Sequence, residues 1–271
     1  MAFKIVTDSS INICHKKEVD IITVPLKISA GEKDFVDNED LNVEEMVTYM
    51  KGYNGKSTTS CPNYSEWEEQ FREGDEIFAV TISSNLSGSY NAANLASQDY
   101  PDKKICVIDS ISTGGSMLLI VEKIRQCEQM GKTFEETAEI VKEYVNQIHI
   151  IFTLESMANL ANNGRVSHVV AKGAELFGIR LIGKGSEIGK IEMIDKAKGK
   201  SRSMEKSFEA MKKCGFTGRK AIIDHVLNEE LAIKLKARIL EEYPGCDVRI
   251  GTCGGLCSFY AEQGGFIVGF E

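Results

Sequence analysis

Residues Glu76–Tyr90, EIFAVTISSNLSGSY, place a buried strand, a polar turn and the start of a helix in direct succession. Glu76–Ile82 is an almost continuous apolar run, which is typical of a strand that is covered on both faces. Ser83–Gly88 is rich in hydroxyl groups, and Tyr90–Ala96 has the composition of a helix. A strand that leads through a short polar turn into a helix is the repeating unit of a parallel α/β layer, so this stretch predicts such a layer.

The alternation of strand and helix continues through the first half of the chain. Apolar, β-branched runs predict further strands, and helical spacing of apolar residues predicts the helices between them. The predicted strands are Lys4–Ser10, Ile21–Ile28 and Ile105–Ser110, and the predicted helices are Leu41–Tyr53, Tyr64–Arg72, Gly114–Met130 and Phe134–Gln147. Pro25 has no amide hydrogen for a strand ladder, so it places Ile21–Ile28 at a sheet edge or beside a bulge.

In the second half, short turns that contain glycine separate the predicted strands. These strands are His149–Leu154, Arg180–Ile182, Lys190–Ile194, Lys220–His225, Val248–Gly251 and Phe266–Phe270. The predicted helices are Glu155–Asn162, Ala171–Phe177, Ser203–Lys213 and Leu231–Tyr243. We therefore predict a two-domain α/β protein, with a parallel α/β first domain over residues 1–155 and an α+β second domain with a mixed or antiparallel sheet over residues 156–271.

The chain of 271 residues carries 32 Lys+Arg against 40 Asp+Glu, a formal net charge of −8. An acidic surface repels phosphate backbones, which argues against nucleic-acid binding. The longest apolar runs, such as Ile77–Ile82 and Met117–Val121, are much shorter than the roughly 20 residues that a membrane span needs. The first residues lack the apolar core and cleavage site of a signal peptide. We expect a cytoplasmic protein without an integral membrane span.

The eight cysteines and four histidines bear on metal binding. Cys253 and Cys257 are the only close cysteine pair, and a Cys-x3-Cys without a second Cys or His pair nearby is a poor zinc signature. The histidines are scattered and share no ligand spacing. We expect free thiols that pack as small apolar groups, and we predict neither a metal site nor a cofactor.

Three polar turns are candidate ligand-binding segments, namely Thr7–Ser10, Ser57–Pro62 and Ser83–Tyr90. Ligands of open α/β sheets sit at the carboxyl ends of the strands. Hydroxyl and backbone N–H donors at helix N-termini suit an anion such as a carboxylate or a phosphate. Helix capping is the competing interpretation, because Ser, Thr and Asp are the usual N-cap residues. The pattern alone therefore indicates a small anionic ligand and leaves the capping interpretation open.

Hydrolysis and nucleotide binding have weak support in the sequence. A nucleophilic Ser needs an adjacent base, and no Gly-x-Ser-x-Gly elbow holds a candidate. His225, which follows Asp224 at a strand end, lies outside the polar turns. Gly183–Gly185 and Gly251–Gly255 match neither a P-loop nor a dinucleotide-binding pattern. An enzyme that acts on a small carboxylated or phosphorylated metabolite stays open as the alternative, and it would need a solvent-open polar cleft.

The order of the motifs resembles the DegV family over essentially the whole chain. The motifs are Thr7–Ser10, Thr59–Pro62, Ile82–Tyr90, Ile108–Ser110 and Leu160–Val166, followed by a glycine-rich tail. The Ser-x-Leu-Ser-Gly-Ser-Tyr turn is the most distinctive of them. The resemblance implies a two-domain α/β protein that binds a long-chain fatty acid in an apolar tunnel. Some members are the acyl-carrying, non-catalytic subunits of a fatty-acid kinase and present the acid to a separate ATP-binding subunit.

Carried over by motif, the resemblance implies that Thr59 and Ser87 hold the carboxylate. Ser60, Ser84 and Gly88 would be further side-chain or backbone donors. Glu262 is a further candidate ligand-binding residue, and here the chain departs from the family, because Glu262 stands at a tail position that the family gives to His. A Glu near a bound carboxylate repels it unless one of the two is protonated. This difference from the family therefore argues against a role in phosphoryl transfer more than it argues against lipid binding.

Lipid binding also has a direct physical basis. Each buried methylene group of an acyl chain contributes roughly 0.8 kcal/mol, and two or three hydroxyl or amide donors offset the desolvation of the head group. Apolar residues that are candidates for the tunnel, or for plain core, are Phe3, Ile28, Met117, Leu118, Ile120 and Phe266. Arg165 follows an Asn-Gly turn, where it is either a solvated residue at a helix end or a contact for a partner.

Overall fold

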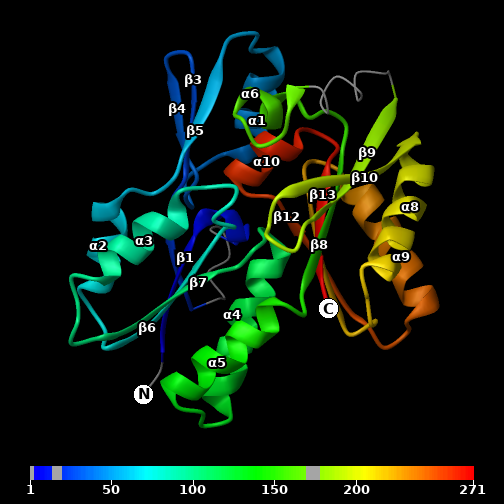
Figure 1. Ribbon diagram of the computed structural model, residues 1–271. Helices are drawn as coiled ribbons and strands as arrows, with labels where there is room; N and C mark the ends of the chain where they lie inside the picture. The colour runs from blue at the N-terminus through cyan, green and yellow to red at the C-terminus, as the bar shows by residue number, and fades with distance from the viewer. Residues whose placement is uncertain (1–2, 14–19, 169–177) are drawn as a thin grey trace.

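The computed structural model describes residues 3–13, 20–168 and 178–271. It contains three sheets, and helices pack between and around them (Figure 1). The predicted helix Ala171–Phe177 lies outside the described residues.

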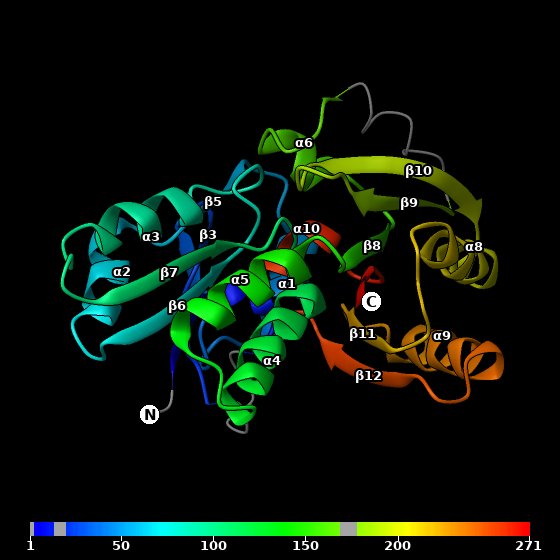
Figure 2. The same ribbon diagram turned by 60° about the horizontal axis from the view of Figure 1, so that its bottom comes forward.

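The first sheet has four parallel strands in the order β2-β1-β6-β7. Their bounds are Ile22–Val24 for β2, Lys4–Asp8 for β1, Glu76–Thr81 for β6 and Lys104–Asp109 for β7. Helices α2 (Tyr64–Phe71) and α3 (Ser89–Ser97) cover one face, and α4 (Gly115–Gln129) and α5 (Phe134–Val145) cover the other (Figure 2). The predicted parallel α/β layer is confirmed, because all neighbouring strands of this sheet are parallel. The apolar run of β6 is buried on both faces, as its sequence predicts.

The segment Ile21–Ile28 does not form the single strand that its apolar run predicts. It divides at Pro25 into β2, which is the edge strand of the parallel sheet, and β3 (Lys27–Ala30). β3 is the central strand of a three-stranded antiparallel sheet, between β4 (Lys33–Val36) and β5 (Ser57–Ser60). The second polar turn of the sequence is thus mostly strand β5. Helix α1 (Val43–Gly52) connects β4 to β5.

The second half is built on a six-stranded mixed sheet in the order β10-β9-β8-β13-β11-β12, and all neighbours are antiparallel except β11 and β12. The bounds are His149–Leu154 for β8, Ile179–Gly185 for β9, Ile191–Lys198 for β10, Lys220–His225 for β11, Asp247–Thr252 for β12 and Phe266–Phe270 for β13. The mixed sheet was predicted. The division at residues 155/156 stays a prediction; β8, which ends at Leu154, pairs with β9 and β13.

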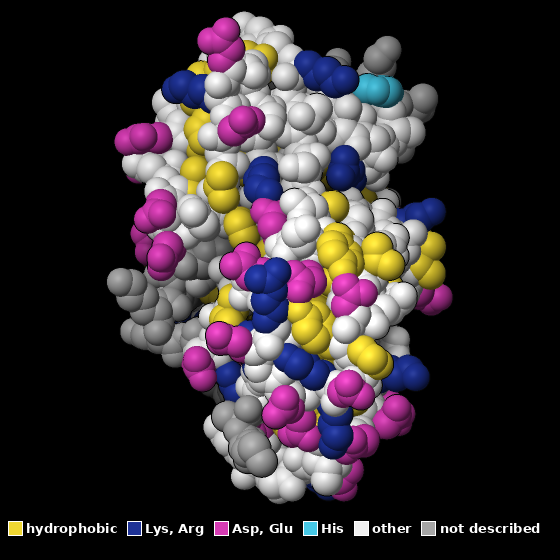
Figure 3. Space-filling model, turned by 90° about the vertical axis from the view of Figure 1, so that its left-hand side faces the viewer, with side chains coloured by type: hydrophobic (Ala, Val, Ile, Leu, Met, Phe, Trp, Pro, Cys, Tyr) yellow, Lys and Arg dark blue, Asp and Glu magenta, His cyan; other side chains and the backbone are white. Residues whose placement is uncertain are grey.

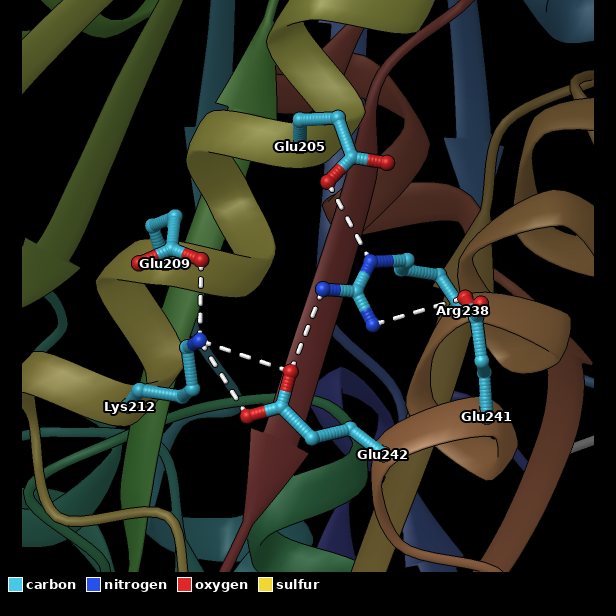
Figure 4. A network of polar contacts seen from close by, with 6 residues as sticks. All are labelled: Glu205, Glu209, Lys212, Arg238, Glu241 and Glu242. Carbon is cyan, nitrogen blue, oxygen red and sulfur yellow. Dashed lines mark hydrogen bonds and ion pairs between the residues drawn. The ribbon is translucent and has the colours of Figure 1, made fainter.

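Helices α8 (Lys200–Lys213) and α9 (Glu229–Glu242) pack side by side on one face of this sheet. Their exposed surfaces carry a network of ion pairs, in which Lys212 contacts Glu209 and Glu242 while Arg238 contacts Glu205, Glu241 and Glu242 (Figure 4). Both cations also lie over the ring of the buried Phe208. Exposed ion pairs each contribute little, so the apolar contacts beneath them hold the helices.

Helix α4 packs on the two large sheets at once, because it contacts β6 of the first and β13 and β11 of the second. The contact depends on two glycines. A Cβ atom at Gly115 would lie 2.7 Å from the Ile222 side chain, and a Cβ atom at Gly269 would lie 2.2 Å from the Ser116 amide nitrogen. Larger side chains at these positions would push the helix from the sheet.

A buried polar network fixes helix α10 (Gly255–Ala261) between the two halves of the chain. The Asp37 carboxylate accepts hydrogen bonds from the Gly255 and Leu256 amides at the start of the helix and from the Ser9 hydroxyl. Asn12 donates to Asp224 on β11 at 2.9 Å and accepts from the Gly254 amide at 2.9 Å. Figure 2 shows α10 at the centre of the molecule, near β8. The network thus sets which side chains of α10 face inward.

Helix α6 (Ala158–Asn162) is shorter than the predicted helix Glu155–Asn162. The difference begins at Ser156, whose hydroxyl accepts a hydrogen bond from the Ala158 amide and thereby stabilises a turn before the helix. None of the described helices is long and apolar enough to cross a membrane.

Candidate functional site

A mostly apolar cavity lies where α10, β5, the turn after β6 and the second sheet meet. Apolar side chains make most of its wall: Leu26, Cys61, Ile82, Leu86, Ile111, Ile150, Phe152, Leu154, Leu160, Ile191, Leu256, Cys257, Tyr260, Ala261 and Ile267. The polar residues and glycines of the wall are Thr59, Ser87, Ser112, Thr113, Arg165, Gly185, Gly189 and Lys190. An apolar cavity with few polar groups suits an apolar molecule that has one polar end.

Thr59 and Ser87, the two residues expected to hold a carboxylate, both line this cavity. Thr59 lies on β5 opposite Ile28 of β3, and its side chain is half-buried. Ser87 lies in the turn between β6 and α3, where its amide donates to the Ser83 carbonyl oxygen at 3.1 Å. The structure therefore brings together one hydroxyl from the three-stranded sheet and one from the parallel sheet.

A chain of contacts links Thr59 to the turn that carries Ser87. The Thr59 hydroxyl is 2.6 Å from the Tyr260 hydroxyl. The Arg165 guanidinium lies 5.7 Å from the centre of the Tyr260 ring, and its Nε donates at 3.1 Å to the carbonyl oxygen of Leu86, which precedes Ser87. Thr59, Tyr260, Arg165 and the Ser87 turn thus form one continuous polar end.

Tyr260 lines the cavity and is not among the residues that the sequence predicts for the site. It lies on α10, 201 positions from Thr59, and no motif marks it. Burial raises the pKa of the Tyr260 hydroxyl, and the hydrogen bond with Thr59 and the nearby charge of Arg165 oppose the rise. Tyr260 is therefore a neutral hydrogen-bond donor and acceptor at physiological pH.

Arg165 is more than a solvated residue at a helix end. Besides its contacts with Leu86 and Tyr260, its guanidinium donates to the Asn163 carbonyl oxygen, and its side chain is half-buried. Its position at the polar end supplies a positive charge to that end of an otherwise apolar cavity. Lys190, which is exposed, is a second cation in the wall.

The tip of the hairpin between β9 and β10 closes one side of the cavity. The Ser83 hydroxyl donates to the Gly189 carbonyl oxygen at 2.9 Å, and the Asn85 side-chain amide donates to the Ile188 carbonyl oxygen at 2.7 Å. Gly189 has a φ of +74°, and a Cβ atom there would lie 2.2 Å from the Ser83 hydroxyl oxygen. Glycine is therefore required both by the backbone conformation and by the close approach.

The other residues expected at the site lie at its margin or away from it. Ser60 is exposed at the end of β5, and the Ser84 amide donates to Asp109, so neither lines the cavity. Gly88 is adjacent to it, since a Cβ atom at Gly88 would lie 3.2 Å from the sulfur of Cys61.

Glu262 faces away from the apolar cavity, on the other side of α10. It lines a second, polar cavity together with Lys51, Ser156 and Asn159. Burial raises the pKa of the Glu262 carboxyl, hydrogen bonds from Ser156 and the Asn159 backbone oppose the rise, and one carboxyl oxygen is buried without a partner. Glu262 therefore does not share a cavity with Thr59 and Ser87.

The first polar turn, Thr7–Ser10, serves the fold. Asp8 is fully buried and accepts hydrogen bonds from the Ser10 hydroxyl, the Ser89 hydroxyl and the Ile82 amide. Burial raises the pKa of Asp8, and the bonds from Ser10, Ser89 and the backbone oppose the rise. The capping interpretation thus holds for this turn, which positions the start of α3 and the turn of Ser87.

None of the six apolar residues considered for the tunnel lines the cavity. Phe3, Met117, Leu118 and Ile120 belong to the core between the parallel sheet and α4, Ile28 belongs to the core beside α1, and Phe266 belongs to the core beneath α8 and α9. The alternative interpretation of these residues as plain core is the right one. Much of the cavity wall comes instead from one face of β8 and one face of α10, which the sequence does not pair.

The described cysteines form no disulfide, and those outside the described residues are not placed. Burial raises the pKa of Cys253 and of Cys257. Among the residues that the structure describes, no group of His, Cys, Asp and Glu could hold a metal ion. On the face of the molecule shown in Figure 3, Lys and Arg alternate with Asp and Glu, and the described residues there make no continuous basic stripe.

Known proteins match this chain over essentially its whole length. The family described as "Uncharacterised protein, DegV family" matches residues 2–271. A DegV domain-containing protein of Streptococcus pneumoniae is 36% identical over 282 residues, which cover 100% of this chain and 99% of the relative. A DegV domain-containing protein of Streptococcus pyogenes is 35% identical and covers 100% of both chains.

Two solved structures agree closely with this fold. A DegV family protein from Eubacterium eligens, loaded with heptadecanoic acid, superimposes with a TM-score of 0.95 at 39% identity and covers 100% of this chain and 99% of its own. The fatty acid kinase (Fak) B3 protein of Streptococcus pneumoniae, loaded with linoleic acid, superimposes with a TM-score of 0.96 at 35% identity, again over 100% and 99% of the two chains. The two-domain α/β fold is thereby confirmed.

Proposed function

The chain belongs to the DegV family, and on that premise we propose that it binds a long-chain fatty acid. The carboxyl group is held by the hydroxyls of Thr59 and Ser87, and the acyl chain lies along the apolar wall of the cavity. The observation that carries the proposal is that Thr59 and Ser87 both line a single, mostly apolar cavity, and that contacts through Tyr260 and Arg165 link Thr59 to the turn of Ser87. Relatives with the same fold are loaded with heptadecanoic and linoleic acids, which supports this ligand class.

The energetics favour an acyl chain over a small polar metabolite. Each methylene that leaves water contributes roughly 0.8 kcal/mol, so a long chain contributes on the order of 10 kcal/mol before ordering costs. The wall that β8 and β13 supply, Ile150, Phe152, Leu154 and Ile267, offers no hydrogen bonds to a sugar or phosphate. A polar ligand in this cavity would lose its hydration without replacement.

Organic extraction of protein purified from cells, followed by mass spectrometry, tests the ligand class. We expect one fatty acid for each protein molecule at most, from more than one expression host. Recovery of no acyl chain from several hosts, together with no uptake of added fatty acid by the stripped protein, would refute the proposal.

The head-group assignment is tested by Ser87→Ala. Loss of one hydroxyl donor to a buried carboxyl should weaken binding by about 1–3 kcal/mol. Ser97→Ala is the matched control, because the Ser97 hydroxyl donates to the Asn94 carbonyl within α3 and does not line the cavity. Unchanged affinity and release rate in Ser87→Ala would place the head group elsewhere.

We also propose that the protein presents the bound acid to a separate ATP-binding kinase subunit. The support is the likeness to the fatty acid kinase B3 protein of Streptococcus pneumoniae. Arg165, which lies at the polar end of the cavity, is the residue of choice for testing the contact. Capture of an ATP-binding protein by the wild type, and its loss with Arg165→Ala when the two proteins are compared at equal acyl loading, would support this role. Unchanged capture would remove Arg165 from it.

A cytoplasmic location is part of the proposal. The free thiols of the described cysteines are the state that a reducing compartment favours. Fractionation of cells that express the protein at its native level tests the location. Recovery of the protein outside the cytoplasmic fraction would contradict it.

A further inference from the structure

We propose that Tyr260 is a binding residue for the ligand's head group, and that the hydroxyl pair Thr59–Tyr260 selects a free acid over an uncharged head group. The inference rests on the function proposed above and adds to it the residue that determines head-group specificity. It is carried by the contacts that surround the Tyr260 hydroxyl at the polar end of the cavity.

The Tyr260 hydroxyl is directed at the place where a carboxyl group would contact Thr59. The two hydroxyl oxygens are 2.6 Å apart, both side chains are half-buried, and both residues line the cavity. Thr59 comes from β5 and Tyr260 from α10, so the pair exists only when these two elements pack together. A ligand oxygen that reaches Thr59 through the cavity therefore also comes within reach of Tyr260.

Counting hydrogens shows why the pair prefers an acid. Each hydroxyl has one hydrogen to donate, and in the pair one hydrogen is used between the two oxygens while the other is free. A carboxylate accepts hydrogen bonds and donates none, so both hydroxyls can turn toward it. Hydrogen bonds to an ionised acceptor are roughly twice as strong as those between neutral groups. An alcohol gains no such charge-assisted bond, so it does not benefit from the second hydroxyl to the same degree.

Arg165 lies beside the Tyr260 ring. Its guanidinium lies over the ring at 5.7 Å from the centre, and the same side chain is tied to Leu86 through its Nε. A cation over the face of a tyrosine ring is attracted to that ring. Its positive charge also stabilises negative charge on the phenol oxygen, which makes the hydroxyl a better hydrogen-bond donor. Arg165 thus acts through Tyr260 as a positioning residue and links it to the turn that holds Ser87.

The position of Glu262 strengthens this assignment. Tyr260 and Glu262 are two residues apart at the end of α10, yet Tyr260 lines the apolar cavity and Glu262 lines the polar one. The Asp37 and Asn12 contacts at the start of the helix fix this rotation. Because Glu262 faces away, Tyr260 is the side chain by which the end of α10 contributes a hydrogen bond to the head group.

The test measures the affinities of heptadecanoic acid and of 1-heptadecanol, which share a chain length and differ at the head group. We expect Tyr260→Phe to weaken acid binding about tenfold or more, the scale of one lost hydrogen bond to a charged group, and to change alcohol binding less than about threefold. Tyr49→Phe is the matched control, because it removes a half-buried tyrosine hydroxyl, bonded to the Ala30 carbonyl, that does not line the cavity.

Each result has a distinct meaning. Equal weakening of acid and alcohol would show that the Thr59–Tyr260 bond only ties α10 to β5, and it would overturn the inference; so would unchanged acid binding in Tyr260→Phe. Wild-type protein that binds neither probe would refute the proposed function itself. As a second variant, Thr59→Val should reduce acid binding, and the double variant should lose less than the product of the two single losses, because the hydroxyls act as one pair.

Discussion

The Ser83 hydroxyl donates a 2.9 Å hydrogen bond to the Gly189 carbonyl oxygen and so joins two turns that are 106 residues apart in the sequence. One turn follows β6 of the parallel sheet and carries Ser87, and the other is the tip of the β9–β10 hairpin of the second sheet. Both turns line the cavity. The bond therefore closes the wall of the proposed lipid site across the boundary between the two sheets.

Ser83→Ala should accelerate release of a bound fatty acid. Loss of one buried hydrogen bond costs about 1 kcal/mol, which corresponds to a several-fold faster release if the hairpin tip must separate from the turn. Stopped-flow transfer of a fluorescent fatty acid to acceptor vesicles measures the rate. Ser97→Ala, whose hydroxyl bonds within α3, should release at the wild-type rate. Equal rates for Ser83→Ala and the wild type would mean that the hairpin tip stays in place during exchange.

Gly189→Ala should destabilise the protein by about 2 kcal/mol or more, because the alanine would have both an unfavourable φ and a clash with Ser83. The variant Gly131→Ala separates the cost of the backbone conformation from the cost of the clash. Gly131 has a similar φ of +70°, and a Cβ atom there meets nothing within 4 Å. Urea unfolding should therefore show a smaller loss for Gly131→Ala. Equal losses would mean that the contact with Ser83 adds nothing to the cost of the backbone conformation.

Asp37→Ala should destabilise the protein by about 3 kcal/mol or more, because it leaves the Gly255 and Leu256 amides and the Ser9 hydroxyl without their buried carboxylate acceptor. Asn63→Ala, which removes an exposed N-cap from α2, should cost only about 1 kcal/mol. Chemical denaturation compares the two variants. A cost for Asp37→Ala no greater than that for Asn63→Ala would show that α10 does not depend on this network.

Glu262→Gln should change how stability depends on pH. Burial raises the pKa of Glu262 above its usual value, so the folded protein binds this proton more tightly than the unfolded chain does. The contribution of Glu262 to stability is therefore greatest below the unfolded pKa and is lost as the pH rises through the folded pKa. Glu262→Gln should remove this loss and make the protein more stable than the wild type at pH 7.

Urea unfolding from pH 4 to pH 8 measures the effect of Glu262→Gln. The difference in unfolding free energy between variant and wild type should increase as the pH rises toward the folded pKa of Glu262, and it should level off above that pKa. Glu69→Gln, at an exposed position on α2, is the control for the substitution itself. A difference that is constant with pH would mean that Glu262 titrates alike in the folded and unfolded chains.

Local patterns in the sequence were enough to predict most helices and the central strands. The apolar run of β6 predicts a strand that is buried on both faces, and the amphipathic spacing of α5 predicts a helix with one buried side, because periodicity reports burial directly. β5 was missed as a strand because Ser57–Ser60 is polar throughout and gains its strand structure only by pairing with β3. Such a pairing depends on a partner that local composition does not specify.

The sequence by itself determined the family, the parallel α/β layer and most of the helices, and its motifs point to Thr59 and Ser87 as site residues, because short motifs and local periodicity carry that information. Only the tertiary structure placed Tyr260 against Thr59, turned Glu262 to the opposite side of α10 and built the cavity wall from β8 and α10. The physical reason is that the rotation of α10 is set by Asp37 and Asn12, which bond to its start from more than 200 residues away along the chain. Contacts between residues so far apart in the sequence produce no periodic pattern in the residues that they orient.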